Sequence, residues 1–231
     1  RFVIAAVAHD LRTPLFALRG YLEGLEQGIT DSPEKQAKYL QVCKEKSAQL
    51  DRLVEDLFTF TKTELLEIDI KGNTVDLSMI IQNSIDSVSL LAHQKHISII
   101  MHQFGEECVV LGDAHLLERS INNLLDNAIR HTPRHGKIFV ECYKSDHNAT
   151  FTIKDTGDGF SSDELHQVFE PLYRGEASRN RLTGGAGLGL TISKRIITQH
   201  GGDLVAGVHL EGGAILSGWI PLANSSLYSN T

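Results

Sequence analysis

The sequence predicts an α+β protein in which a helical hairpin precedes a separate α/β domain with a mixed sheet. Over residues 1–66, apolar residues recur in steps of three and four, which is typical of long amphipathic helices. A polar stretch at residues 67–73 then interrupts the pattern and predicts a hinge. Beyond it, short alternating strands are interleaved with further helical patterns, so a layered domain is expected at residues 74–222.

The first helix is expected to end near Gly28. One apolar stripe runs along it and predicts a packing partner. Pro14 lies inside this helix, where it removes one backbone hydrogen bond at a cost of roughly 3 kcal/mol and favours a kink. The stripe consists of Val7, Leu11, Leu15, Leu18, Leu22 and Leu25.

The second helix is expected to start at Asp31-Ser32-Pro33-Glu34, which supplies a cap residue followed by proline at a first helical position. Its apolar spacing is that of a coiled-coil seam with one polar interruption. Because a lone hairpin buries too little apolar surface, two copies are expected to form a dimeric four-helix bundle. The seam consists of Tyr39, Cys43, Lys46, Leu50, Leu53, Leu57 and Phe60.

The second domain is expected to place its helices on one face of the sheet. Neighbouring strands joined by short turns favour antiparallel pairs over crossovers. A polar tail at residues 223–231 is expected to be flexible. Helices are predicted at 78–93, 114–131 and 188–200, and strands at 97–102, 108–111, 137–144, 149–155, 203–210 and 214–221.

Composition excludes several classes of function. A formal net charge of −7 argues against wholesale binding to nucleic acid or to an anionic membrane. The three cysteines are widely spaced, so neither a disulfide framework nor a zinc site is expected, and they read as reduced packing residues of a cytoplasmic protein. The first residues resemble no signal peptide, and the chain starts without Met inside a helix, as a fragment of a longer protein does.

The motif His9-Asp10-Leu11-Arg12-Thr13-Pro14 carries a candidate nucleophile. His9 lies two residues from both Val7 and Leu11, and therefore points about 200° away from the apolar stripe. Thr13 and Phe16 share its side of the helix. A neutral imidazole has a free ring nitrogen that can attack phosphorus. Asp10 is the nearest group to orient the ring, although adjacent helical side chains do not face each other.

The helix at residues 114–131 carries a polar stripe beside its apolar one. Ser120, Asn123, Asn127 and Arg130 follow each other at helical spacing. Two amides one turn apart, with a cation three residues on, suit Mg²⁺ bound to phosphate, because amide oxygens are hard ligands and arginine neutralises charge. A merely solvated polar face is the alternative.

Two glycine-rich segments follow. Asp155 ends a strand and precedes Gly157 and Gly159, where a carboxylate can accept a hydrogen bond from an adenine amine. Gly185, Gly187 and Gly189 then precede a helix whose N-terminal amides favour phosphate. Between the two segments, residues 169–181 form a basic loop that can close over phosphates. Neither the dinucleotide nor the P-loop glycine spacing is present.

With these motifs in order, the chain resembles the catalytic core of sensor histidine kinases of two-component systems over residues 1–222. The resemblance implies a dimerisation and phosphotransfer hairpin at 1–66 and a gyrase-like ATP-binding domain at 74–222. It implies ATP and Mg²⁺ as cofactors, and ATP-dependent phosphorylation of His9 with transfer to an aspartate of a response regulator. Response-regulator phosphatase activity is also expected.

The resemblance also implies roles for individual residues. His9 would be phosphorylated, Asp10 would be its acid–base partner, and Thr13 would position water for dephosphorylation of the response regulator. Asn127 would hold Mg²⁺, helped by Asn123. The remaining nucleotide-site residues would be Arg130 and His131 beside the phosphates, Asp155 at adenine, and Arg174, Leu188 and the glycines 157, 159, 185, 187 and 189 in the pocket and lid.

Three alternatives compete with this interpretation. A gyrase-like ATPase would hydrolyse ATP to drive conformational change, a nucleotide-binding phosphatase or scaffold would not phosphorylate itself, and a coiled-coil module would be purely structural. The HDLRTP hairpin argues against the first alternative, the intact His9, Asn127, Asp155 and glycines argue against the second, and the second domain contradicts the third. The expected partners are a second copy of the chain and a response regulator, with no nucleic acid and with membrane attachment only through upstream segments.

Overall fold

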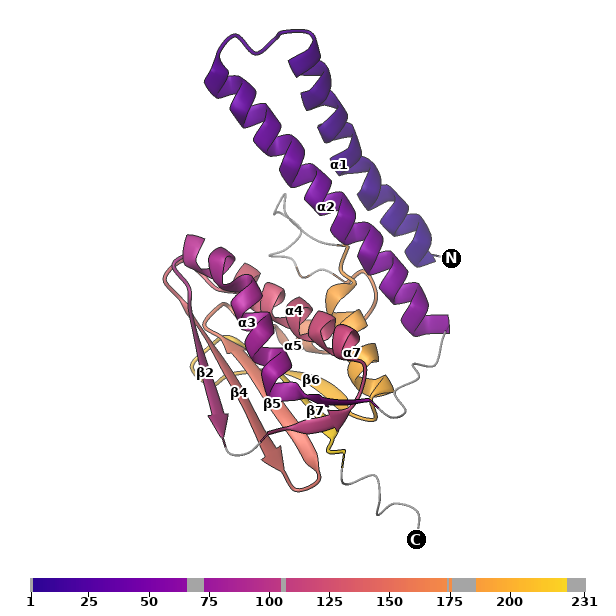
Figure 1. Ribbon diagram of the computed structural model, residues 1–231, viewed down its shortest axis with the longest axis vertical. Helices are drawn as coiled ribbons and strands as arrows, with labels where there is room; N and C mark the ends of the chain where they lie inside the picture. The colour runs from indigo at the N-terminus through magenta and orange to yellow at the C-terminus, as the bar shows by residue number, and fades with distance from the viewer. Residues whose placement is uncertain (1, 66–72, 105–106, 174, 176–185, 224–231) are drawn as a thin grey trace. The chain divides into compact units, whose positions relative to one another are not determined.

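The structure is a computed structural model that describes residues 2–65, 73–104, 107–173, 175 and 186–223 (Figure 1). The chain divides into two compact units: residues 1–64 with 171–188, and residues 65–170 with 189–231. The predicted hinge, apart from Asn73, and the tail beyond residue 223 lie outside the described residues. None of the helices in the described ranges has the length and apolar character that crossing a bilayer requires.

Two long helices form the predicted hairpin. α1 spans Phe2–Glu26 and α2 spans Pro33–Leu65. Gly28 has φ +67°, a left-handed conformation that a glycine adopts without steric cost, and it lies in the turn that ends α1. The Ser32 hydroxyl accepts the Lys35 N–H at 3.3 Å, which satisfies one of the free amides at the start of α2.

The predicted seam of α2 is confirmed, since every one of its members is buried or half-buried. On α1, Val7 and Pro14 are buried, and the helix runs through Pro14 without a break. Leu15 and Leu22 of the predicted stripe remain 53% and 48% exposed. One hairpin therefore leaves part of its apolar surface uncovered: Ile4, Leu15, Phe16, Leu22, Leu40, Val54 and Phe58 are exposed.

The second unit contains a five-stranded sheet in the order β2-β4-β5-β7-β6. β2 and β4 are parallel, and the other pairs are antiparallel, so the predicted mixed sheet is confirmed. The helices α3 (Leu77–Gln94), α4 (Ala114–His131) and α7 (Gly189–Gln199) cover one face of it (Figure 1). The strands are β2 (Ser98–Phe104), β4 (Lys137–Ser145), β5 (Asn148–Asp155), β6 (Asp203–Val208) and β7 (Ala214–Pro221).

The expectation that neighbouring strands pair antiparallel is wrong for β2 and β3 (Val109–Leu111). β3 pairs instead with β1 (Thr74–Asp76), a strand that the sequence did not reveal. The reason lies in Asp76, whose carboxylate accepts the N–H groups of both Ser78 and Cys108. This carboxylate caps α3 and draws the start of β3 towards β1. A further short helix, α5 (Ser162–Leu165), begins with a capping box at Ser161.

The core of this unit lies between the sheet and its helices. The apolar stripe predicted on α4 consists of Leu117, Ile121, Leu124 and Ala128, and it is confirmed because none of these residues is more than 1% exposed. Burying one such aliphatic side chain contributes about 1.5 to 3 kcal/mol. Ser120 was expected to line the polar edge of α4, and this expectation is wrong: Ser120 is fully buried, and its carbonyl accepts the Ser193 hydroxyl of α7 at 3.0 Å.

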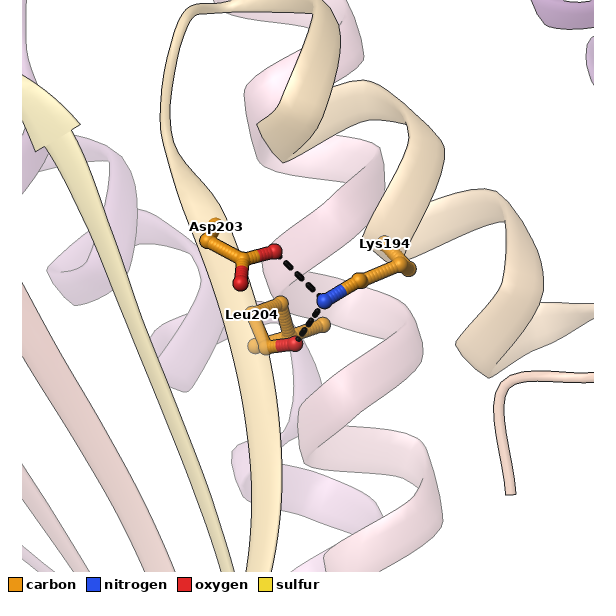
Figure 2. Close-up of polar contacts among 3 residues, drawn as sticks. All are labelled: Lys194, Asp203 and Leu204. Carbon is orange, nitrogen blue, oxygen red and sulfur yellow. Dashed lines mark hydrogen bonds and ion pairs between the residues drawn. The ribbon is translucent and has the colours of Figure 1, made fainter. Parts of the chain in front are cut away.

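A lysine fixes α7 to the edge of the sheet. Figure 2 shows the Lys194 ammonium donating to the Asp203 carboxylate at 2.5 Å and to the Leu204 carbonyl at 2.6 Å. The hydrogen bond from Lys194 lowers the pKa of Asp203. The same ammonium lies 5.2 Å from the ring centroid of Phe169, a cation–π contact. Side-chain contacts thus hold α7 on the β6 side as well as on the α4 side.

Candidate functional site

The phosphoryl-accepting candidate lies on the outside of α1. The His9 side chain is 76% exposed, which confirms that it faces solvent. The Asp10 carboxylate lies 3.7 Å from His9 Nδ1, a distance slightly longer than a hydrogen bond. Thr13 and Phe16 are exposed one and two turns further along the helix. The structure therefore brings together on one helix the acceptor and the two groups that the sequence grouped with it.

Asp155 is a buried carboxylate at the end of β5. It is 3% exposed, and its Oδ1 accepts the N–H of Gly157 at 2.8 Å and that of Ala214 at 3.1 Å. Burial raises the pKa of Asp155, and the two backbone hydrogen bonds oppose this effect. Within the described part of the chain both hydrogen bonds use Oδ1. Oδ2 can therefore accept a hydrogen bond from a ligand.

Glycines let the backbone crowd around this carboxylate. A Cβ at Gly157 would lie 2.5 Å from the His131 carbonyl oxygen. A Cβ at Gly213 would lie 2.0 Å from the Asp155 carbonyl oxygen, and Gly213 has φ +94°. Gly159 also has a left-handed φ of +74°. The sequence did not predict a role for Gly213, because a glycine in a turn between two strands gives no indication that it packs against Asp155.

The polar edge of α4 lies beside the start of α7. Asn123, Asn127, Arg130 and His131 are all half-buried on the C-terminal half of α4. The Asn123 side-chain amide donates to the Gly189 carbonyl at 3.3 Å, which ties this edge to the first residue of α7. The free amides at the N-terminus of α7, which favour anions, are therefore close to Asn123.

Lys95 caps the C-terminal end of α4. Its ammonium donates to the Ile129 carbonyl at 2.6 Å and to the Arg130 carbonyl at 3.3 Å. A cation at a helix C-terminus is favourable because it satisfies carbonyls that lack intrahelical partners. Sequence reasoning missed this residue, because its helical context gave no indication that it reaches a different helix.

The glycine segment before α7 is described only in part. Gly187 has φ +71°, and its carbonyl accepts the Leu172 N–H at 3.0 Å. A Cβ at Gly187 would lie 2.8 Å from the Tyr173 carbonyl oxygen, so glycine is required there. Leu188 is fully buried. Arg174 and Gly185, together with the basic residues Arg179 and Arg181, lie outside the described residues.

The side chains near α4 fit a magnesium ion shared with phosphate rather than a metal cage built from protein alone. Among the described residues, no cluster of three or more His, Cys, Asp or Glu is arranged to hold a metal. Mg²⁺ usually takes one or two protein oxygens and completes its shell with phosphates and water. The half-buried Asn127 amide suits that role.

His200 follows α7 and holds it against the loop before α4. Its Nε2 accepts the Asp113 N–H at 3.1 Å, and its Nδ1 donates to the Ile196 carbonyl at 2.7 Å. The ring is 3% exposed, and burial lowers the pKa of His200. Because both ring nitrogens have partners, His200 is a structural residue held in its neutral form.

Two protein families match the chain in sequence. The His Kinase A (phospho-acceptor) domain matches residues 1–66, and the family of histidine kinase-, DNA gyrase B- and HSP90-like ATPases matches residues 112–224. The chain belongs to the sensor histidine kinases of two-component systems. In this histidine kinase core, His9 falls within the phospho-acceptor match, whereas Asp155 and the polar edge of α4 fall within the ATPase match.

Named relatives agree with this family. The sensor protein VanS of Enterococcus faecium is 34% identical over 206 residues, which cover 88% of the chain and 53% of VanS. The chain therefore spans about half the length of this relative. The structure of the mycobacterial sensor histidine kinase MprB is 28% identical with a TM-score of 0.56, and the match covers 65% of this chain and 97% of that one.

A further solved structure shares the fold across both units. The histidine kinase ThkA in complex with the response regulator protein TrrA has a TM-score of 0.74. The match covers 96% of this chain and 61% of that chain. At 22% identity this likeness shows the fold: a helical hairpin followed by an α/β domain with a mixed sheet.

Proposed function

We propose that the chain transfers the γ-phosphoryl group of ATP to His9 and then to an aspartate of a response regulator. The observation that carries this proposal is the exposed His9 imidazole, 76% accessible, within the segment that matches the phospho-acceptor family. An exposed histidine can also be an ordinary surface residue without a functional role. The family match and the Asp10 carboxylate beside it favour the reactive role.

ATP binds the second unit through adenine and phosphate contacts. Asp155 accepts a hydrogen bond from the adenine amine, and the glycines at 157 and 159 let the backbone approach the base. Arg130 and His131 border the phosphates. We assign Gly185, Gly187, Leu188, Gly189 and Arg174 to the phosphate side and its lid. Asn127, helped by Asn123, would hold Mg²⁺, which neutralises phosphate charge when bound.

In the transfer step, the deprotonated ring nitrogen of His9 attacks the γ-phosphorus. A nitrogen–phosphorus bond forms, the bond from the γ-phosphorus to its bridging oxygen breaks, and ADP leaves with that oxygen. Asp10, whose carboxylate is 3.7 Å from Nδ1, orients the ring and accepts its other proton as positive charge develops. Positioning and charge neutralisation supply most of the rate, as in phosphoryl transfer generally.

The hairpin then binds the response regulator and donates the phosphoryl group to it. Phosphohistidine passes its phosphoryl group to an aspartate of a receiver domain that docks near Phe16, and Thr13 orients water for the reverse, phosphatase activity. ThkA, which shares this fold, was solved in complex with a response regulator protein. We further propose that the chain acts as a homodimer in the cytoplasm, within a parent protein that is anchored in the cell membrane.

The test is incubation of the chain with γ-labelled ATP and Mg²⁺. The proposal predicts a protein label that is lost in acid and stable in alkali, and that is absent from His9→Gln. His9→Gln should still bind a fluorescent ATP analogue as tightly as the native chain, because His9 lies in the other unit from Asp155. A gyrase-like ATPase would instead release phosphate without protein label, at a rate that His9→Gln leaves unchanged.

A separate substitution tests the proposed phosphatase role. Thr13→Ala removes only an exposed hydroxyl one turn from His9, so autophosphorylation should persist. Loss of phosphate from the phosphorylated response regulator should slow markedly when this variant is added in place of the native chain. Equal rates with both proteins would remove Thr13 from the proposed mechanism.

A further inference from the structure

Two buried thiols lie together in the second unit and take no part in the proposed phosphoryl transfer. Cys108 and Cys142 are both 0% exposed, and neither is in a disulfide. Their side chains are hydrogen bonded to each other. The third cysteine, Cys43, lies on α2 of the hairpin and belongs to the other unit.

The strand register explains why these two residues meet. Cys142 is a buried position of β4, in the alternation that turns Ile138 and Val140 into the core. Its partner in the parallel pairing is Gln103, near the end of β2. β2 ends at Phe104, and Cys108 follows four residues later in the sequence. Cys108 therefore lies close to the end of β2 that pairs with Cys142.

The backbone on either side holds Cys108 over the helix-covered face of the sheet. Its carbonyl accepts the Leu77 N–H at 3.0 Å, and its N–H donates to the Asp76 carboxylate at 3.2 Å. Asp76 and Leu77 begin α3, one of the helices that cover that face (Figure 1). These backbone contacts keep the Cys108 side chain on the same side of the sheet as the inward-pointing Cys142.

The two thiols are chemically distinct. The hydrogen bond from Cys142 lowers the pKa of Cys108 and outweighs the opposing effect of burial. The same hydrogen bond, with burial, raises the pKa of Cys142. A thiolate is the attacking species in thiol–disulfide exchange, and Cys108 directly precedes the short strand β3, whereas Cys142 lies within the central sheet. Cys108 is therefore the better first nucleophile and Cys142 the resolving thiol.

We propose that Cys108 and Cys142 are a redox modification site, which closes to an intramolecular disulfide on exchange with a small disulfide such as oxidised glutathione. The thiolate of Cys108 attacks one glutathione sulfur, forming a mixed disulfide and releasing one glutathione thiolate. Cys142 then loses its proton, attacks the Cys108 sulfur and releases the second glutathione. The protein loses two protons and two electrons, and oxidised glutathione becomes two reduced molecules.

Access to the buried pair requires local opening of the domain. β1 and β3 form a two-stranded ladder of three residues per strand, and β3 has one further bridge, from Val110 to Leu222 just after β7. Because β3 takes no part in the five-stranded sheet and has so few backbone contacts, it is the part of this unit that we expect to open locally. Cys108 lies immediately before β3, so opening of this ladder exposes it first. The closed disulfide would bracket all of α4, the helix that carries Asn123 and Asn127, and should raise the midpoint of thermal unfolding.

The test equilibrates the reduced chain with glutathione buffers of increasing oxidising strength and then counts free thiols. The native chain should fall from three thiols to one. Its mass should decrease by two hydrogens without added glutathione, and proteolysis should yield a peptide pair that joins Cys108 to Cys142. The matched control Cys43→Ser should fall from two thiols to none with the same midpoint.

Single-cysteine variants identify the order of attack. Cys142→Ser should retain one glutathione on Cys108, whereas Cys108→Ser should leave Cys142 reduced. Because peptide mapping of the native chain needs no variant, a serine variant that fails to fold leaves the test intact. Three thiols persisting in oxidised glutathione, stable glutathione adducts on the native chain, or a bond through Cys43 would overturn the inference. None of these results bears on phosphorylation of His9.

Discussion

At the scale of single residues, Asp155 combines a structural cost with the binding role that we propose for it. Its carboxylate is buried and accepts two backbone N–H groups through Oδ1. Burial raises its pKa, so the ionised form is less favourable here than in water. A further hydrogen bond to Oδ2 would offset this cost, and we propose the adenine amine as its donor.

Asp155→Asn separates the two effects. The amide oxygen can still accept both backbone N–H groups, but the amide nitrogen would then face the adenine amine, donor against donor. Loss of a hydrogen bond to a charged group costs about 1.5 to 3 kcal/mol, so ATP affinity should fall at least about tenfold in titration calorimetry. The midpoint of thermal unfolding without nucleotide should stay unchanged or rise. Unchanged affinity would remove Asp155 from the site.

Burial of His200 makes the free energy of unfolding depend on pH. Its folded pKa lies below that of a free imidazole because the ring is buried, so the unfolded chain binds the proton more readily. Stability is therefore present above the unfolded pKa, near 6.5, and is lost as pH falls towards the folded value. Chemical unfolding of the native chain should show this loss as pH falls below about 6.5, and His200→Gln should flatten it. The exposed control His166→Gln should keep the native slope.

Sequence reasoning worked for residues whose context is local and failed for those whose role depends on distant segments. His9 could be placed on the solvent side because helix geometry alone sets its direction, and Asp155 because it ends an alternating strand. Lys95 and His200 were missed, since each contacts backbone of another helix or loop far along the chain. No periodicity encodes such contacts.

At the scale of elements, the turn between β6 and β7 packs against Asp155 of the proposed nucleotide site. Gly212 and Gly213 have φ values of +90° and +94°. A Cβ at Gly212 would meet nothing within 4 Å, whereas one at Gly213 would lie 2.0 Å from the Asp155 carbonyl oxygen. The two neighbours thus share a backbone conformation and differ in the space available.

This pair makes a matched experiment. Gly212→Ala should cost about 1 to 2 kcal/mol of unfolding free energy, from its left-handed backbone alone. Gly213→Ala should cost more and should also weaken ATP binding, because the turn must move away from Asp155. Urea unfolding and nucleotide titration measure both quantities. Equal stability losses with unchanged ATP affinity in both variants would show that the contact with Asp155 is unimportant.

The helices and long strands were predictable because each carries its own period, and α4 was found with its bounds unchanged at residues 114–131. The short elements were not. β1 has three residues and α5 four, too few for any repeat to show. The partner of β3 also escaped prediction, because the Asp76 carboxylate rather than a hydrophobic pattern draws it to β1.

At the scale of the whole molecule, the apolar residues that the hairpin leaves exposed predict self-association. Val54 and Phe58 lie one turn apart on α2 and are 55% and 69% exposed. In a four-helix bundle of two hairpins such residues become core. The double variant Val54→Glu/Phe58→Glu should therefore sediment as a monomer at concentrations where the native chain is a dimer.

The control for this experiment lies on the second unit. Leu90 and Leu91 of α3 are 68% and 45% exposed, so Leu90→Glu/Leu91→Glu places the same charges on comparable apolar surface outside the hairpin. This variant should remain dimeric. A native chain that sediments as a monomer, or dissociation by both variants alike, would contradict the proposed bundle.

Phosphorylation of His9 by ATP can be checked by peptide mapping after incubation of the chain with Mg-ATP. Trypsin should release Phe2–Arg12, in which His9 is the sole histidine. We expect mass spectrometry under neutral conditions to find this peptide heavier by one phosphoryl group. Fragmentation should assign the group to the imidazole, and acid should remove it. Phosphorylation confined to any other peptide, or ATP bound with no phosphopeptide at all, would contradict it.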